Sequence, residues 1–140
     1  MTVRVLRGFS GSVEDRLAIR ERIESYNDAV FRQDADDWAK CWAEDAVWQV
    51  GEHRAEGRSA IRDLWLRLMA GFDAAGMYVA HGAVSVTGDE ADSRSYMLEL
   101  LKQSDGTERL VSGRYDDRLR RDPDGAWRFV SRGYTVLQVR

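Results

Sequence analysis

The sequence predicts a single α+β domain, in which a curved antiparallel sheet wraps around three N-terminal helices. The length of 140 residues suits one domain with one core. Apolar residues recur at helical spacing in the first half of the chain, whereas strand-like patterns and turn sequences fill the second half. Helices and strands segregated in this way are typical of α+β proteins. Because no repeat or linker divides the chain, residues 1–140 are expected to form one domain.

Three helices are expected in the first half of the chain. The first covers residues 13–33, because its apolar side chains recur at intervals of three or four, at Ile19, Ile23, Tyr26 and Val30. A short second helix is expected at about 35–43, where Asp34 is well placed as the N-cap. The third helix is expected over residues 60–72, with Ser59 as its cap.

Strands are expected between and after these helices. Residues 46–50 and a short return segment within 51–57 form the first pair. After Gly76 the pattern changes to four longer strands, at about 77–87, 91–103, 107–121 and 126–139. The sequences "TGDE", "QSDGT" and "DPDG" form the turns between them. Residues 1–11 are expected to form a loose arm or a short edge strand. A curved sheet with a long helix across its mouth can enclose a pocket.

The composition argues against several classes of partner. A net charge of −3 and a pI of about 5.4 argue against nucleic acid, whose phosphates require a basic surface. No apolar run approaches the ~20 residues of a membrane span, and no signal-peptide pattern opens the sequence, so a cytoplasmic protein without a membrane partner is expected. Cys41 is the only cysteine, and the sequence lacks a metal-binding cluster and a glycine-rich phosphate loop. No cofactor is therefore expected.

Four segments of the chain resemble one protein family. They read "YNDAVFRQDADDWAKCWAEDAVWQV", "AEGRSAIRDLW", "GDEADSRSYMLEL" and "SGRYDDRLRRDPDGAWRFVSR". In this order and spacing they resemble the SnoaL-like branch of the nuclear transport factor two-like superfamily, over about residues 13–135. The resemblance implies a cone-shaped α+β barrel with an apolar pocket, and a homodimer or homotrimer. Because the superfamily includes polyketide cyclases, dehydratases, isomerases, a dehydrochlorinase and non-catalytic binders, the fold alone does not select an activity.

The catalytic residues of these relatives match this chain only in part. The hexachlorocyclohexane dehydrochlorinase pattern resembles the chain at Asp34 and at Arg132. Its histidine would fall at about Met77 and its lysine at about Ala29. The aspartate of scytalone dehydratase would fall at Phe31, which cannot ionise. None of these mechanisms therefore transfers intact.

His81 offers a substitute base, because it lies four residues after Met77. Residues four apart in an extended strand point the same way, so His81 is expected to face the pocket if the family histidine does. Val84 and Val86 also resemble inward-facing residues, yet their parity is opposite to that of His81. A β-bulge at Gly82 would reconcile the two patterns, because a glycine in a strand often marks a bulge.

The site hypothesis combines three residues. His81 is the general base, because imidazole titrates near neutral pH. Asp34 holds the ring and stabilises its charged form, and Arg132, or a tyrosine, stabilises the developing oxyanion or the departing anion. The pocket wall is expected to consist of Tyr26, Val30, Trp48, Trp65, Met77, Tyr96 and Tyr115, which could also bind a substrate.

Each of these residues also has a purely structural interpretation. Asp34 would only cap a helix, His81 would be a hydrogen-bonded structural histidine, and Arg132 would lie on a surface edge. The aromatic side chains would form the core rather than a cavity. Arg114, Asp116 and Asp117 are expected to form a charged surface across strands.

The leading functional hypothesis is a cofactor-independent lyase, isomerase or cyclase that transfers protons on a small or medium hydrophobic molecule. The alternative is a non-catalytic protein that binds a hydrophobic ligand in the same pocket. A third interpretation places the tryptophans at a subunit interface. The polarity of the cavity distinguishes the first two, because an enzyme needs at least two convergent polar groups.

Overall fold

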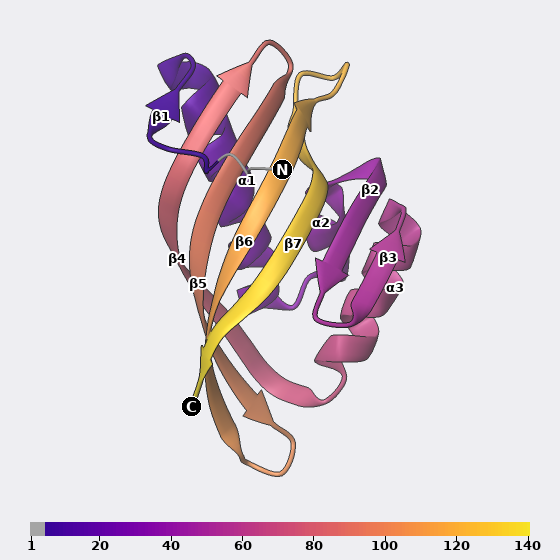
Figure 1. Cartoon of the computed structure of the whole chain (residues 1–140). Coiled ribbons are helices and arrows are strands. Elements are labelled where there is room, and N and C mark those ends of the chain that lie inside the picture. The colour runs from indigo at the N-terminus through magenta and orange to yellow at the C-terminus, as the bar shows by residue number, and fades with distance from the viewer. Residues whose placement is uncertain (1–4) are drawn as a thin grey trace.

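The computed structural model describes residues 5–140 as three helices and one seven-stranded sheet, which confirms the α+β class (Figure 1). The helices are α1 (Val13–Arg32), α2 (Ala35–Lys40) and α3 (Arg58–Met69). The strands are β1 (Phe9–Ser10), β2 (Trp42–Val50), β3 (His53–Glu56), β4 (Phe72–Thr87), β5 (Glu90–Gln103), β6 (Glu108–Arg121) and β7 (Trp127–Val139). Of the expected N-terminal arm, residues 1–4 lie outside the described part, and β1 confirms the short edge strand.

The strands form one mixed sheet in the order β1-β4-β5-β6-β7-β2-β3. Strands β4 to β7 make the expected antiparallel meander. However, β1 is parallel to β4 and β2 is parallel to β7, so the sheet is not antiparallel throughout. β1 lies beside β4 at one edge of the meander, and β2 lies beside β7 at the other edge. Parallel pairs of this kind need a long connection between the two strands, and helices lie in both connections.

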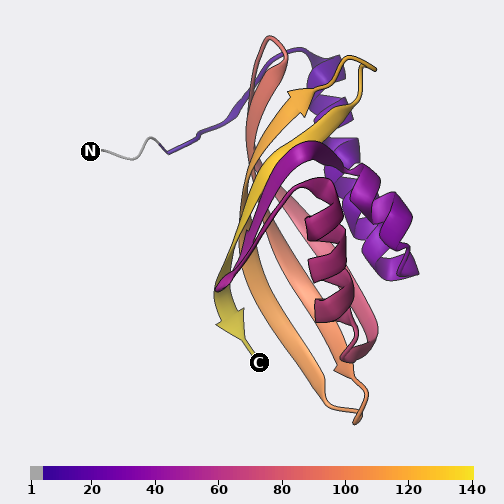
Figure 2. The same cartoon turned by 90° about the vertical axis from the view of Figure 1, so that its right-hand side faces the viewer.

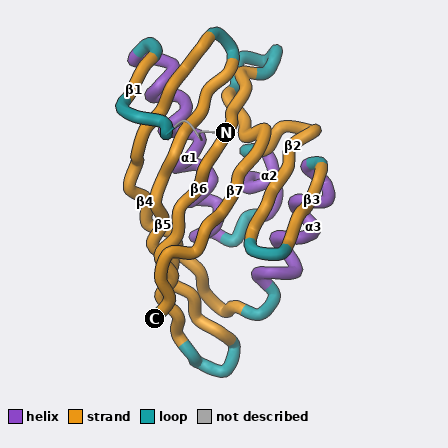
Figure 3. Tube along the Cα trace, in the orientation of Figure 1, coloured by secondary structure: helices purple, strands orange, loops and turns teal. Residues whose placement is uncertain are grey.

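All three helices lie against one face of the curved sheet, and the opposite face carries no helix in the described part of the chain (Figure 2). We call the helix-covered face the inner face and the opposite one the outer face. The β5–β6 hairpin projects beyond the helices at the lower end of the molecule (Figure 3). The inner face therefore holds the core.

Capping groups explain where the first two helices begin. The Ser12 hydroxyl accepts a hydrogen bond of 3.0 Å from the backbone N–H of Asp15, and α1 follows. The Asp34 carboxylate likewise accepts one of 3.0 Å from the N–H of Asp37, which confirms Asp34 as the N-cap of α2. Ser59 is not the cap of α3; Gly57 takes this position without a side-chain hydrogen bond, at a φ of 89° that favours glycine.

Strand pairing also moves two boundaries relative to the sequence prediction. The second helix ends at Lys40 rather than near residue 43, because Trp42 already pairs with Phe129 of β7. β4 begins at Phe72 rather than at residue 77, because its first residues pair with the end of β5. In both places, hydrogen bonding to a neighbouring strand prevails over local helical spacing.

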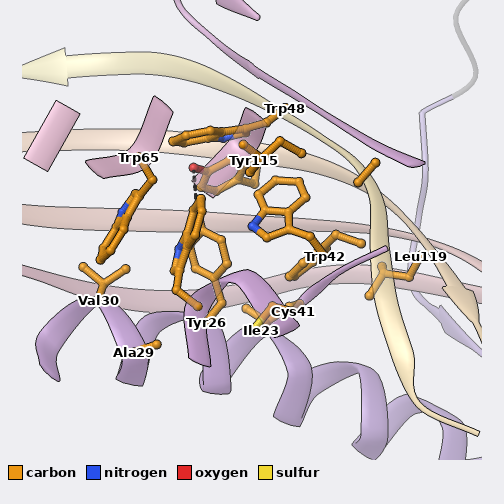
Figure 4. Close-up of a cluster of buried hydrophobic side chains, with 14 of the residues drawn as sticks. Ile23, Tyr26, Ala29, Val30, Cys41, Trp42, Trp48, Trp65, Tyr115 and Leu119 are labelled. Atoms are coloured by element: carbon orange, nitrogen blue, oxygen red, sulfur yellow. Dashed lines mark hydrogen bonds between the residues drawn. The ribbon is translucent and has the colours of Figure 1, made fainter. Parts of the chain in front are cut away.

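Aromatic side chains fill the space between the helices and the inner face (Figure 4). Trp38 of α2 stacks on Trp65 of α3, with ring centroids 4.8 Å apart and planes inclined by 16°. The cluster also includes Tyr26, Trp42, Trp48, Tyr115 and Phe129, all of them buried. Because aromatic side chains each bury about 150–250 Å², this cluster supplies much of the apolar area that holds helices and sheet together.

A β-bulge interrupts the pairing of β4 with β5, as the opposite parities of His81 and Val84 predicted. His81 pairs with Ser95 and Val84 with Ser93, so three steps along β4 match two steps along β5. Ser95 and Ser93 are buried on the inner face, and side chains that pair directly share a face. The bulge therefore turns both His81 and Val84 inward.

Substitution of Gly82 should destabilise the bulge. A Cβ at this position would lie 2.7 Å from the backbone carbonyl oxygen of Arg94, and neither backbone segment can move freely within the sheet. We expect Gly82→Ala to lower the free energy of unfolding in urea by about 1–3 kcal/mol. Gly71→Ala is the matched control, because a Cβ at Gly71 meets nothing within 4 Å and should leave the stability almost unchanged. Equal stability of the two variants would contradict a tight bulge.

Candidate functional site

A groove of about 560 Å³ lies between β1, the first half of α1, and strands β4 and β5. Its apolar lining includes Phe9, Val13, Leu17, Ile19, Ile23, Val79 and Val84. Its polar lining consists of His81, Ser93, Arg16, Arg20 and Arg94. The groove thus combines an apolar wall with several convergent polar groups, which is the usual composition of a ligand site.

Among the lining residues, His81 is the one whose side chain ordinarily titrates near neutral pH. Its Nε2 atom lies 3.3 Å from Oε1 of Glu24 on α1, and its side chain is 16% exposed. Because a carboxylate only accepts hydrogen bonds, Nε2 carries the proton and Nδ1 keeps the lone pair. Burial lowers the pKa of His81, although Glu24 opposes this and Arg20 adds to it. His81 is therefore neutral near pH 7 and able to accept a proton.

Asp34 does not join His81. Its carboxylate caps α2 and lies 3.0 Å from Nη1 of Arg32, in a surface position where its side chain is 38% exposed. The partner of His81 is Glu24, which precedes Asp34 by ten residues. With a rise of about 1.5 Å per residue along α1, the two carboxylates lie far apart. The structure thus places Glu24, rather than Asp34, within hydrogen-bond distance of the imidazole.

Arg132 is neither on a surface edge nor in the groove; it is buried in the core. Its Nε and Nη2 atoms donate hydrogen bonds of 2.7 and 3.1 Å to the two carboxylate oxygens of Asp117. The guanidinium carbon lies 4.4 Å from the ring centroid of Tyr26, 3.7 Å from that of Tyr115 and 4.1 Å from that of Phe129. These charged and aromatic contacts hold Arg132 in the core, outside the lining of the groove.

Asp117 does not belong to the charged surface that was expected for Arg114, Asp116 and Asp117. Arg114 and Asp116 do form an exposed ion pair of 2.9 Å, but Asp117 is buried on the inner face. The reason is the alternation of β6, which places Tyr115, Asp117 and Leu119 on the same side. Burial raises the pKa of Asp117, and Arg132 opposes this rise. Ser93 donates a hydrogen bond of 3.3 Å to Asp117, so the groove wall contacts the buried pair.

Of the seven expected wall residues, six lie in the core and one lies apart. The buried ones are Tyr26, Val30, Trp48, Trp65, Met77 and Tyr115. The hydroxyls of Tyr26 and Tyr115 are 3.2 Å apart and hydrogen-bonded to each other. Tyr96 is exposed on the outer face, where it pairs with Arg114 of β6. The expected wall residues therefore do not line the groove, and whether any of them binds a substrate stays a prediction.

Sequence reasoning missed Glu24 and Glu99. Glu24 left no signal, because its partner is 57 residues away in the sequence. Glu99 did leave one, because it alternates with Met97 and Leu101 on the inner face of β5. It pairs across the sheet with Met77, and burial raises its pKa, while the Tyr134 hydroxyl opposes this rise. Glu99 is thus a second carboxylate with a raised pKa on the inner face.

Residues 5–140 contain no group of three or more histidine, cysteine, aspartate or glutamate side chains placed to hold a metal ion. Among the helices described, none has the length and apolarity needed to span a membrane.

Solved structures first establish the class of fold. A candidate aromatic ring hydroxylase from Novosphingobium aromaticivorans superposes with a TM-score of 0.85 at 28% identity, covering 92% of this chain and 93% of the other. A candidate dehydratase of the nuclear transport factor two-like family from Streptomyces avermitilis gives 0.80 at 18% identity, covering 91% and 99%. A hexachlorocyclohexane dehydrochlorinase gives 0.79 at 21% identity, covering 92% of each chain. The chain thus has the nuclear transport factor two-like fold.

A family model then places the sequence within this fold class. The SnoaL-like domain matches residues 11–133, nearly the whole chain. The protein belongs to the SnoaL-like domain family, as the sequence resemblance predicted. No curated protein matches the sequence.

Removal of one member of the buried ion pair should cost far more than removal of a surface carboxylate. Asp117→Ala leaves the Arg132 charge buried without a partner, so we expect the free energy of unfolding to fall by about 3–5 kcal/mol. Asp116→Ala, one residue earlier and exposed, should cost less than about 1 kcal/mol.

The double variant Arg132→Met/Asp117→Leu tests the cause. Because it removes both charges and keeps apolar volume, it should be more stable than Asp117→Ala. If denaturation in urea shows that the double variant is the less stable of the two, the unpaired charge is not the source of the loss.

Proposed function

We propose that this protein is a cofactor-independent acid–base enzyme of the lyase or isomerase type, acting on a small or medium apolar molecule in the groove. The observation that carries the proposal is the His81–Glu24 pair within an apolar lining. A neutral imidazole oriented by a carboxylate is a suitable general base near neutral pH. The role that the sequence suggested for Asp34 passes to Glu24.

The proposed reaction begins with proton transfer to Nδ1 of His81. The proton leaves a carbon next to a carbonyl group or next to a carbon that bears a leaving group. The electron pair of the broken C–H bond then forms either an enolate or a carbon–carbon double bond with loss of the leaving group. Glu24 stabilises the imidazolium, and an arginine of the groove takes the anion-stabilising role first given to Arg132. The proton returns to a different carbon or leaves with the departing group.

The relatives support this class of reaction without defining the substrate. Dehydration and dehydrochlorination, the reactions named for two of the structural neighbours, are both eliminations. An apolar molecule lying against the apolar lining would displace water from the imidazole, which would strengthen the electrostatic contacts of the reacting groups.

The alternative function is non-catalytic binding of a hydrophobic ligand. Met77 and Phe31 favour it, because they occupy positions at which catalytic relatives carry a histidine and an aspartate. Met77 is buried in the core, and Phe31 packs against Tyr78 with ring centroids 5.6 Å apart. A binder would retain ligand affinity but would not move protons.

Proton abstraction is tested by hydrogen exchange on carbon. We expect the wild-type protein to catalyse deuterium exchange of the α-protons of small ketones in D2O, measured by proton NMR. His81→Ala should slow exchange at least about 100-fold, because a positioned base contributes this much. His53→Ala is the matched control, since His53 is the other histidine of the chain and lies exposed on β3. Ligand binding without exchange would support the binder instead.

The pH dependence of exchange should identify the base. Because burial lowers the pKa of His81, the rate should rise with pH and level off, with a midpoint below the ordinary histidine value of 6.5. Glu24 raises this pKa, so Glu24→Gln should shift the midpoint to lower pH and reduce the plateau rate. A midpoint that does not move in Glu24→Gln would show that another group is the base.

A further inference from the structure

We propose that the groove selects an amphipathic carboxylate, a molecule with an apolar body and one carboxylate group. The inference rests on the proposed function, because it names the substrate class for the same groove. The geometry combines arginines with exposed apolar side chains along one rim. The arginines suit the carboxylate of such a molecule, and the rim suits its apolar body.

The charge of the groove is unlike that of the rest of the protein. The whole chain has a net charge of −3, yet the described lining residues include Arg16, Arg20 and Arg94 and no aspartate or glutamate. Two carboxylates lie beside this lining: Glu24, which is bonded to His81, and buried Asp117, which accepts a hydrogen bond from Ser93 and is paired with Arg132. With His81 neutral, the site carries an excess of positive charge.

Two of the groove arginines lack the carboxylate partner that many other arginines of the described chain have. Arg114 and Arg128, for example, are paired with aspartates at 2.9 and 2.7 Å. Within residues 5–140, neither Arg16 nor Arg94 has a carboxylate partner. Each donates one hydrogen bond to a backbone carbonyl, from Arg16 to Gly11 and from Arg94 to Leu6.

Several guanidinium donors are consequently available to a ligand. Each guanidinium has five N–H donors, and a backbone carbonyl occupies only one of them in Arg16 and Arg94. The side chain of Arg94 alternates with buried Ser93 and Ser95 and so lies on the outer face with Tyr96, which leaves the donors of Arg16 and Arg20 for a ligand in the groove. Arg20 reaches Glu24 only at 3.4 Å, and its side chain is 60% exposed. Carboxylates match such donors because guanidinium can bind both of their oxygens.

The apolar part of the groove is its solvent-exposed rim on β1 and α1. Phe9, Val13 and Leu17 follow at intervals of four residues and are 60%, 70% and 52% exposed. Together with buried Ile19 and Ile23 they form a continuous apolar wall next to the arginines. An apolar body lying against this wall would remove these side chains from water, which is favourable.

The test compares 2-naphthoate with 2-naphthamide by isothermal titration calorimetry. The two probes share the same rings and differ in charge, so their affinity ratio measures the preference for an anion. The wild-type protein should bind the carboxylate at least about tenfold more tightly, because a charge-assisted hydrogen bond adds about 1.4 kcal/mol or more. The Arg16→Gln/Arg20→Gln variant should lose this preference and keep its affinity for the amide.

The control variant is Arg54→Gln/Arg114→Gln, which removes two charges outside the groove. It should bind both probes as the wild type does. Equal affinity of the two probes in the wild type, no binding of either, or a preference that survives in Arg16→Gln/Arg20→Gln, would overturn the proposal. Dimerisation that Leu17→Glu abolishes and that 2-naphthoate inhibits would assign the groove to a second copy of the chain, which would also overturn it.

Two further measurements separate this proposal from the enzymatic one. His81→Gln removes the base but keeps the arginines, so it should still prefer the carboxylate even though it does not catalyse exchange. In the wild type, 2-naphthoate should raise the pKa of His81 measured by NMR, because an anion opposes the effect of Arg20. If the wild type prefers the carboxylate but catalyses no proton exchange, the proposed ligand class is supported and the proposed enzymatic activity is contradicted.

Discussion

The buried ion pair of Arg132 and Asp117 constrains the packing of the whole inner face. Two charges without water require fixed partners, so the two hydrogen bonds set the relative position of β6 and β7. The guanidinium also lies against Tyr26 of α1, which ties the long helix to the same point of the sheet. The tryptophan cluster packs around this arrangement and fills the centre of the molecule. The centre of the molecule is therefore filled, and the groove lies at its edge.

A single extra residue in β4 determines what the groove contains. Without the bulge, His81 and Val84 would face opposite sides of the sheet, and one of them would point away from α1. With it, the imidazole meets Glu24 while the apolar face of the strand continues past it. Gly82 fits here because the backbone of Arg94 leaves no room for a Cβ. The same neighbour, Arg94, also borders the groove, and its guanidinium bonds the backbone carbonyl of Leu6.

The sequence predicted the fold well, because caps and periodicity are local. Asp34 was recognisable as a cap, the four long strands follow from alternation and turns, and the bulge at Gly82 follows from conflicting parities. The site was predictable only in part, because its contacts join distant elements. Nothing in the sequence near Glu24 indicates that a histidine of a distant strand contacts it. The resemblance to the family suggested that Asp34 and Arg132 face a pocket, but their hydrogen-bond partners place both residues elsewhere. For Asp117, alternation with Tyr115 and Leu119 was a stronger guide to burial than its charge.

The shortness of β1 has a kinetic consequence. This strand has only two residues, Phe9 and Ser10, and both are exposed. Segments with so few buried contacts detach at a free energy far below that of global unfolding. The wall of the groove that β1 forms can therefore detach from β4 and pair with it again, while the core around Arg132 stays folded. Exchange of a bound molecule would then follow the fast local opening of an edge, and a mutation could change residence time without altering overall stability.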